Sequence, residues 1–197
     1  MMSFSSLVLL FVGSALINNF ILSRFLGICA FLGVSKRLET ALGMGAAVTF
    51  VMTISGAVSW AIQRYILVPF HLPFLQYVVF ILVIATLVQF LEMVIRRYSP
   101  SLYEAFGIYL PLITTNCAIL GVALLVAGSD YGLLETLVFS VGSAVGWTLA
   151  IVLMAGLREE LEFADVPLSL QGPALSLLIA AIMSLTFMGF SGLVPAS

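Results

Sequence analysis

Six apolar runs, separated by short polar segments, make up most of the 197-residue chain. A membrane-spanning helix needs about 20 consecutive apolar residues. The first run, residues 4–34, is too long for one simple span and too short for two, so we expect a span followed by a half-length or re-entrant segment. The other runs cover residues 38–62, 74–95, 106–127, 133–157 and 173–193. The pattern predicts an all-α, polytopic membrane protein with six transmembrane helices.

Polar residues interrupt two of these runs, and each interruption predicts a break in a helix. Asn18-Asn19 divides the first run, whereas Pro111 and the cluster Thr114-Thr115-Asn116 divide the fourth. Irregular backbone at membrane depth is tolerated only where protein or a water-filled cavity surrounds it. We therefore expect broken first and fourth helices.

The two cysteines of the chain each open a copy of the same apolar septet. Cys29-Ala30-Phe31-Leu32-Gly33-Val34-Ser35 recurs as Cys117-Ala118-Ile119-Leu120-Gly121-Val122-Ala123. The copies indicate one membrane domain, residues 1–197, built from repeat one (1–97) and repeat two (100–197). Because each repeat has three spans, an odd number, the second repeat must cross the membrane upside down. Inverted repeats of this kind place discontinuous helices and a functional site near the midplane.

Composition supports the membrane interpretation. The chain has 62% hydrophobic residues, 8% charged residues and a mean hydropathy of +1.24, whereas a soluble domain carries about 25% charged residues. No basic patch suggests a nucleic acid partner. The sequence also lacks a phosphate-binding Walker loop, a GxGxxG or HExxH motif and a candidate catalytic triad, so we do not expect a self-contained enzyme.

The distribution of cationic residues predicts the orientation. Alternate loops place five of them on one side of the membrane and only Arg64 on the other. The richer side is expected to be cytoplasmic, which leaves both termini outside, in the periplasm of a Gram-negative cell. The five residues on the cytoplasmic side are Lys36, Arg37, Arg96, Arg97 and Arg158.

The cysteine pair admits three interpretations from the sequence alone. Cys29 and Cys117 could be buried structural thiols, could form a disulfide, or could bind an iron–sulfur cluster near the midplane. A [2Fe–2S] cluster usually has four cysteine ligands, so this chain would need a second subunit for the other two. Glycines close to the cysteines would let backbone approach a ligand; they are Gly27, Gly33 and Gly121.

Five further polar residues are expected at membrane depth, beside the predicted breaks. They could form hydrogen bonds between helices or line a path for ions or water. They are Asn18, Asn19, Thr114, Thr115 and Asn116.

Six short runs spread over the chain carry a family resemblance: Asn18-Asn19-Phe20, Leu26-Gly27-Ile28-Cys29, Gly33-Val34-Ser35-Lys36, Leu110-Pro111-Leu112-Ile113-Thr114-Thr115-Asn116-Cys117-Ala118, Ala164-Asp165-Val166-Pro167 and Phe187-Met188-Gly189-Phe190-Ser191-Gly192. Together they resemble the A-type subunit of the Rnf electron-transport complex over essentially the whole chain. The paralogous E-type subunit of the sodium-pumping NADH:quinone reductase has an acidic residue where Asn18 stands, which favours the Rnf branch. Ala30 departs from members that have proline after the first cysteine.

The resemblance implies a bacterial inner-membrane subunit of a ferredoxin:NAD⁺ oxidoreductase that couples electron transfer to Na⁺ or H⁺ translocation. It implies one [2Fe–2S] cluster shared with the homologous E-type subunit of the Rnf complex, with Cys29 and Cys117 as two of its ligands. Gly27, Gly33, Asn116 and Gly121 would surround that site. The other partners would be Rnf subunits B, C, D and G. Electrons would arrive from the iron–sulfur protein of B type and leave to the flavin of the G-type protein.

Three alternatives remain open at this stage. The chain could be the E-type subunit of the sodium-pumping quinone reductase. It could be a small secondary transporter, since inverted repeats with broken helices are also transporter architecture. It could also be an assembly scaffold whose thiols are incidental.

Overall fold

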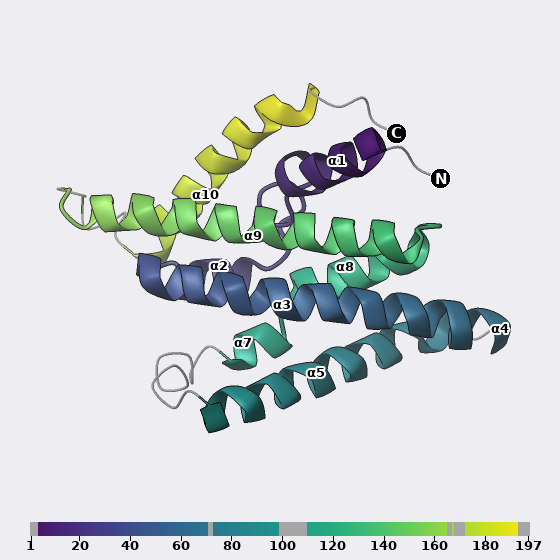
Figure 1. Ribbon diagram of the computed structural model, residues 1–197. Helices are drawn as coiled ribbons and strands as arrows, with labels where there is room; N and C mark the ends of the chain where they lie inside the picture. Colours follow the sequence, from purple (N-terminus) through teal and green to yellow (C-terminus); the bar gives the residue numbers. More distant parts are fainter. Residues whose placement is uncertain (1–3, 71–72, 99–109, 165–166, 168–171, 193–197) are drawn as a thin grey trace.

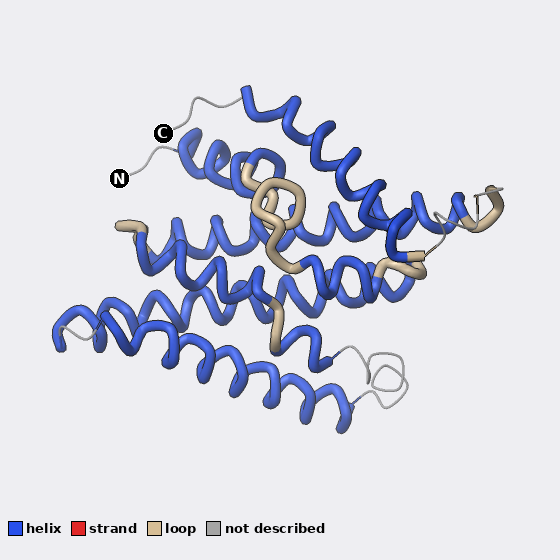
Figure 2. The backbone as a smooth tube through the Cα atoms, turned by 180° about the vertical axis from the view of Figure 1, so that it is seen from behind, coloured by secondary structure: helices blue, strands red, loops and turns tan. Residues whose placement is uncertain are grey.

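The computed structural model describes residues 4–70, 73–98, 110–164, 167 and 172–192, and within these ranges all regular structure is helical, without strands (Figures 1 and 2). Two long helices, α3 (Leu38–Ile62) and α9 (Leu133–Leu161), form the centre. The remaining elements are α1 (Phe4–Val12), the π-helix η1 (Gly13–Ile17), α2 (Ile28–Val34), the π-helix η2 (Gln63–Leu67), α4 (Val68–Phe70), η3 (Pro73–Leu75), α5 (Gln76–Tyr98), α7 (Leu110–Thr114), α8 (Cys117–Gly128), α10 (Pro173–Met188) and η5 (Gly189–Gly192).

Helices α3 and α9 pack antiparallel through small residues. Gly45 near the start of α3 lies against Thr148, and Gly56 near its end lies against Ser140. The Thr148 hydroxyl donates to Ala144 O of its own helix (2.8 Å) and also lies 3.4 Å from Gly45 O of α3. Close approach through small residues is how helices associate where water cannot drive them together. The two helices therefore form a closely packed centre, against which the other helices pack.

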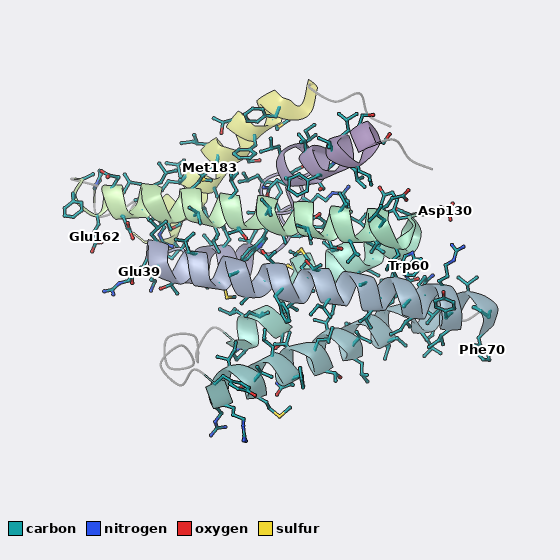
Figure 3. All side chains as sticks on the ribbon, viewed as in Figure 1. Glu39, Trp60, Phe70, Asp130, Glu162 and Met183 are labelled. Atoms are coloured by element: carbon teal, nitrogen blue, oxygen red, sulfur yellow. The ribbon has the colours of Figure 1, made fainter. Side chains whose placement is uncertain are left out.

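The remaining helices cover this centre on two sides (Figure 1). Helix α5 lies on one side with α7, and α1 and α10 lie on the other. Charged side chains gather at the ends of the bundle, with Glu39 and Glu162 at one end and Asp130 at the other (Figure 3). The long apolar middle between charged ends is the distribution that a bilayer requires.

Within the described residues, four helices are long and apolar enough to cross a membrane, namely residues 38–70, 76–98, 111–128 and 133–161. Two shorter apolar helices cover residues 5–17 and 173–188. The chain is therefore a polytopic, helical membrane protein, as the sequence predicted. The predicted start of repeat two at residue 100, the predicted start of the fourth run at residue 106 and the predicted end of the last span at residue 193 lie outside the described residues.

The first helix reaches the centre through two glycines of α9. A Cβ on Gly142 would meet Ser14 Oγ, and a Cβ on Gly146 would meet the Ala15 backbone, with Ala15 Cα at 2.9 Å. Both glycines lie on one face of α9 because they are four residues apart. This pair therefore lets the backbone of η1 lie directly on α9, immediately before the chain leaves the helix.

Replacement of Gly146 by alanine is expected to destabilise the protein by about 1–3 kcal/mol, because the methyl group would overlap backbone atoms that cannot rotate away. Gly156, on the same helix, has no atom of the described residues within 4 Å of a Cβ position. Gly156→Ala should therefore be neutral or raise stability by up to about 1 kcal/mol. Scanning fluorimetry of the purified protein checks both, and equal melting temperatures for the two variants would contradict this account.

Candidate functional site: the cysteine cleft

Asn19 organises the first break, residues 18–27. Its side-chain amide donates to Gly146 O (2.7 Å) on α9 and to Ala15 O (3.3 Å), and its Oδ1 accepts from the Ile21 and Leu22 backbone N–H groups at 3.1 and 3.3 Å. These bonds replace the helical pairing that the break removes. Asn19 is 1% exposed and fixes the direction in which the chain leaves η1.

Two residues in the left-handed region turn the chain back towards the centre. Phe25 has φ +55° and Gly27 has φ +84°. A positive φ is strained for a residue with a side chain, so Phe25 marks a constrained turn on the surface, where 60% of it is exposed. Gly27 carries no such strain and leads directly into α2, which holds Cys29.

The second break is short and ends in a capped helix. The chain leaves α7 at Thr114, and Asn116 in extended conformation caps α8 by accepting from the Ala118 backbone N–H at 3.0 Å. An Asn side chain at this position satisfies one of the free N–H groups of the first turn. Cys117 is consequently the first residue of α8.

The two breaks meet at the cysteines. The Gly27 backbone N–H donates to Cys117 Sγ at 2.8 Å. Consecutive Cα atoms are about 3.8 Å apart, so Cys29, two residues after Gly27, lies within about 12 Å of that sulfur. Both thiols are free; Cys29 is exposed and Cys117 is partly buried. We call this group of residues, Gly27, Cys29, Asn116 and Cys117, the cysteine cleft.

Trp147 lies against Gly27 in the cysteine cleft and was not singled out from the sequence. A Cβ on Gly27 would lie 2.7 Å from Trp147 Nε1 and 3.1 Å from Asn116 Oδ1. Trp147 is 0% exposed, and among the described residues neither its indole N–H nor the Asn116 Nδ2 group has a hydrogen-bond acceptor. With the Gly27 N–H, three kinds of hydrogen-bond donor surround the cleft. Such donors favour a negatively charged group there.

Arg158 also lies near the cysteine-bearing helix α2, which its position in the sequence did not predict. Its Nη1 donates to Leu32 O (3.0 Å) and to Ser35 Oγ (2.9 Å). Leu32 lies in the last turn of α2, where a cation both pairs with free carbonyl groups and interacts favourably with the helix dipole. Arg158 therefore fixes the far end of the short helix that carries Cys29.

The other predicted residues lie at varying distances from the cysteine cleft. Gly121 packs closely under Leu26 and Phe20, whereas Gly33 makes only an ordinary contact with Leu112 at 3.7 Å. Asn18 and Thr115 are exposed, and the Thr115 hydroxyl donates to Pro111 O at 2.9 Å. Thr114 is partly buried. Three of the polar side chains beside the breaks thus form hydrogen bonds with backbone groups, namely those of Asn19, Thr115 and Asn116.

The fold and the cleft together define a class: a polytopic helical membrane protein in which two broken helices bring a cysteine pair together. The chain belongs to the Rnf-Nqr family, whose model, described as "Rnf-Nqr subunit, membrane protein", matches residues 7–194.

Its relatives confirm the resemblance to the A-type subunit. The chain is 55% identical over 190 residues to the A-type subunit of the ion-translocating oxidoreductase complex of Syntrophotalea carbinolica, covering 96% of this chain and 98% of the relative. It is 55% identical over 188 residues to the A-type subunit of the Na⁺-translocating ferredoxin:NAD⁺ oxidoreductase complex of Acetobacterium woodii, covering 95% and 98%. It is 56% identical over 187 residues to the A-type subunit of the ion-translocating oxidoreductase complex of Cronobacter sakazakii, covering 95% and 97%.

Proposed function

We propose that this protein is the membrane electron-transfer subunit, of A type, in an ion-translocating ferredoxin:NAD⁺ oxidoreductase, the Rnf complex. The observation that carries the proposal is the convergence of both cysteine segments, in which the Gly27 N–H reaches Cys117 Sγ. The names of relatives that match nearly the whole chain support the assignment to this complex. A path for electrons across a bilayer requires a redox group inside it, and the cysteine cleft provides ligands of the appropriate kind.

The proposed cofactor is a [2Fe–2S] cluster held by Cys29 and Cys117 together with two cysteines of the homologous E-type subunit. When bound, such a cluster takes up one electron and passes it on. The chain supplies two thiols where four are usual. Cys29 is exposed, as are Phe25 at 60% and Arg24 beside it, so the cleft has an open side on which a partner would complete the ligand set.

The surroundings of the cysteine cleft fit an anionic cluster. Thiolate ligands and the sulfides give such a centre negative charge, and N–H donors around its sulfur atoms stabilise it and tune its potential. The Gly27 N–H already points at Cys117 Sγ. The Trp147 and Asn116 N–H groups are unpaired donors nearby, within the described part of the chain. In a dry membrane interior, unpaired donors of this kind are costly, and a polar centre in the cleft offsets that cost.

The proposed topology has six spans in two inverted repeats, with both termini in the periplasm and the protein in the bacterial inner membrane. The antiparallel packing of α3 on α9 supports it. So do the directions of α2 and α8, which start near each other beside mid-length of α3 and run to opposite ends of the bundle (Figure 1). The E-type subunit would lie on the open side of the cleft. Rnf subunits B, C, D and G complete the proposed assembly, with the B-type protein delivering electrons and the G-type protein receiving them.

Chemical labelling of the thiols in the purified complex tests ligation without changing the sequence. A membrane-permeant maleimide is added before and after iron is removed with dithionite and a chelator, and the cysteine peptides are quantified by mass spectrometry. Iron-bound thiolates are protected from the reagent. We therefore expect labelling of both Cys29 and Cys117 to rise at least tenfold on iron removal, with labelling in detergent-unfolded protein as the reference for complete reaction.

Two outcomes would contradict the proposal. Cys29 could react fully while iron is still bound, which would show that no ligand or partner occupies it. Alternatively, both cysteines could stay equally unreactive before and after iron removal, as buried structural thiols would. Either result would leave the chain as a structural subunit of the complex.

A further inference from the structure

Seven buried side-chain polar atoms have no hydrogen-bond partner in the part of the chain that the structure describes, and all seven lie along one seam. The seam runs from the end of α3 that precedes Gln63 to the cysteine cleft. Its atoms are Gln63 Oε1, Ser59 Oγ, Thr136 Oγ1, Ser140 Oγ, Ser143 Oγ, Trp147 Nε1 and Asn116 Nδ2. We call this row the polar seam.

Helix α9 supplies the continuous part of the polar seam. Thr136, Ser140, Ser143 and Trp147 follow one another at spacings of four, three and four residues, which places them on one face of the helix. All four are 0% exposed. At 1.5 Å per residue the row extends about 16 Å along the helix axis. It therefore crosses about half the thickness of a bilayer core.

Helix α3 supplies the opposite wall. Ser140 Oγ lies against Gly56. Ser59 is three residues beyond Gly56 and Gln63 four residues further, so both lie on the same face. Ser59 is 0% exposed, whereas Gln63 is only partly buried and is followed by the exposed Arg64. The polar seam thus ends close to the surface at this end of the bundle, the end marked by Trp60 and Asp130 in Figure 3.

At its inner end the polar seam reaches the cysteines. Trp147 Nε1 lies 2.7 Å from the position of a Cβ on Gly27, and Asn116 Oδ1 lies 3.1 Å from the same position. The Gly27 N–H donates to Cys117 Sγ. The seam is therefore continuous, through neighbouring residues, from Gln63 to Cys117.

The hydroxyls of the polar seam differ from other hydroxyls of the same helices. A Ser or Thr in a membrane helix ordinarily bonds to the carbonyl group one turn earlier. Thr49, Thr53 and Thr148 do so at 2.7, 2.7 and 2.8 Å. Each buried polar group without a partner costs about 1–3 kcal/mol. Hydroxyls that lack this bond need a ligand that both donates and accepts hydrogen bonds, and water is the smallest such ligand.

We propose that the polar seam binds a file of internal water molecules that connects the cysteine cleft with the surface near Gln63. Each hydroxyl would donate to one water and accept from the next, and Asn116, whose Nδ2 group carries two N–H donors, would donate one of them to the innermost water. The role of this file rests on the proposed function: reorienting water dipoles would offset the negative charge that an electron adds in the cleft. Its existence rests only on the unpaired atoms of the seam.

Radiolytic footprinting of the purified complex tests the water file directly, because hydroxyl radicals generated from bound water oxidise the side chains beside it. The probe is H₂¹⁸O, and mass spectrometry reports ¹⁸O incorporation. Met154 is the reference, since it is also 0% exposed and lies on α9, seven residues past Trp147 and therefore beyond the inner end of the seam. Trp147 is expected to be oxidised at least tenfold faster than Met154. Equal or faster oxidation of the methionine would overturn the proposal.

Matched serine variants make the test specific. Ser140→Ala and Ser143→Ala remove seam hydroxyls, and together they should lower the oxidation rate of Trp147 at least threefold. Ser55→Ala is the control, because Ser55 is equally buried on α3 but donates to Met52 O at 3.2 Å. If Ser55→Ala lowers the rate as much as the seam variants, the proposal is wrong. Footprinting does not depend on iron ligation. If Trp147 is oxidised as expected in a complex whose thiols fail the labelling test, the water file is supported and the proposed cofactor is rejected.

Discussion

Replacement of Cys29 or Cys117 by serine should abolish the EPR signal of the proposed [2Fe–2S] cluster in the assembled complex and stop electron flow from ferredoxin to NAD⁺. Serine keeps the size of the side chain but supplies a hydroxyl in place of the thiolate that the cluster requires. Loss of either residue leaves this chain with one thiol for a cluster that usually has four cysteine ligands. We expect the iron and acid-labile sulfide of this centre, and its EPR signal in the reduced complex, to fall at least tenfold in either variant.

Thr115→Ala is the matched control, since Thr115 lies two residues before Cys117 and is exposed. Its hydroxyl donates to Pro111 O, outside the cysteine cleft. This variant should keep the iron, the signal and at least half of the electron flow. Gel filtration of all three variants confirms that the subunits remain assembled. A cysteine variant that retains both the EPR signal and full activity would reject ligation by that residue.

Sequence patterns predicted the positions of both breaks because polar residues there interrupt apolar runs. The structure ends η1 at Ile17, before Asn18, and starts α8 at Cys117, after Asn116. The length of the first break was not predictable. Three apolar residues lie within this break and are at most 2% exposed, namely Phe20, Ile21 and Leu22. In the sequence they continue the apolar pattern of a helix, although in the structure they are buried in an irregular segment.

The content of the cysteine cleft was predictable only in part. The repeated septets drew attention to Cys29 and Cys117, but nothing in the local pattern places Trp147 beside Gly27, because the two residues lie far apart in the chain. The polar seam did leave a signal. Thr136, Ser140 and Ser143 recur at helical spacing in an otherwise apolar run, although only the structure shows that their hydroxyls lack the usual carbonyl partner among the described residues.

Gly27→Val is expected to have the second-largest effect, a loss of at least tenfold in the iron content of the cysteine cleft. Gly27 has φ +84°, and a side chain in the left-handed region costs about 1–2 kcal/mol, more for a β-branched residue. Its Cβ would also lie 2.7 Å from Trp147 Nε1 and 3.2 Å from Ala118 Cβ, so overpacking adds about 1–3 kcal/mol. The Gly27 segment must then move away from α8, which removes the N–H donated to Cys117 Sγ and displaces Cys29.

Gly33→Val separates this local effect from a general intolerance of valine in α2. Gly33 lies in the same short helix, but its Cβ position meets only Leu112 Cδ1 at 3.7 Å among the described residues, the flexible end of a side chain. A cost of about 3 kcal/mol in the Gly27 variant shifts the equilibrium between the native and the displaced position of the Gly27 segment roughly a hundredfold towards the displaced one. The Gly33 variant should keep most of its iron. Iron analysis and EPR of both assembled variants measure the difference. Equal iron in the two would show that the Gly27 contact with Cys117 is not needed to form the site.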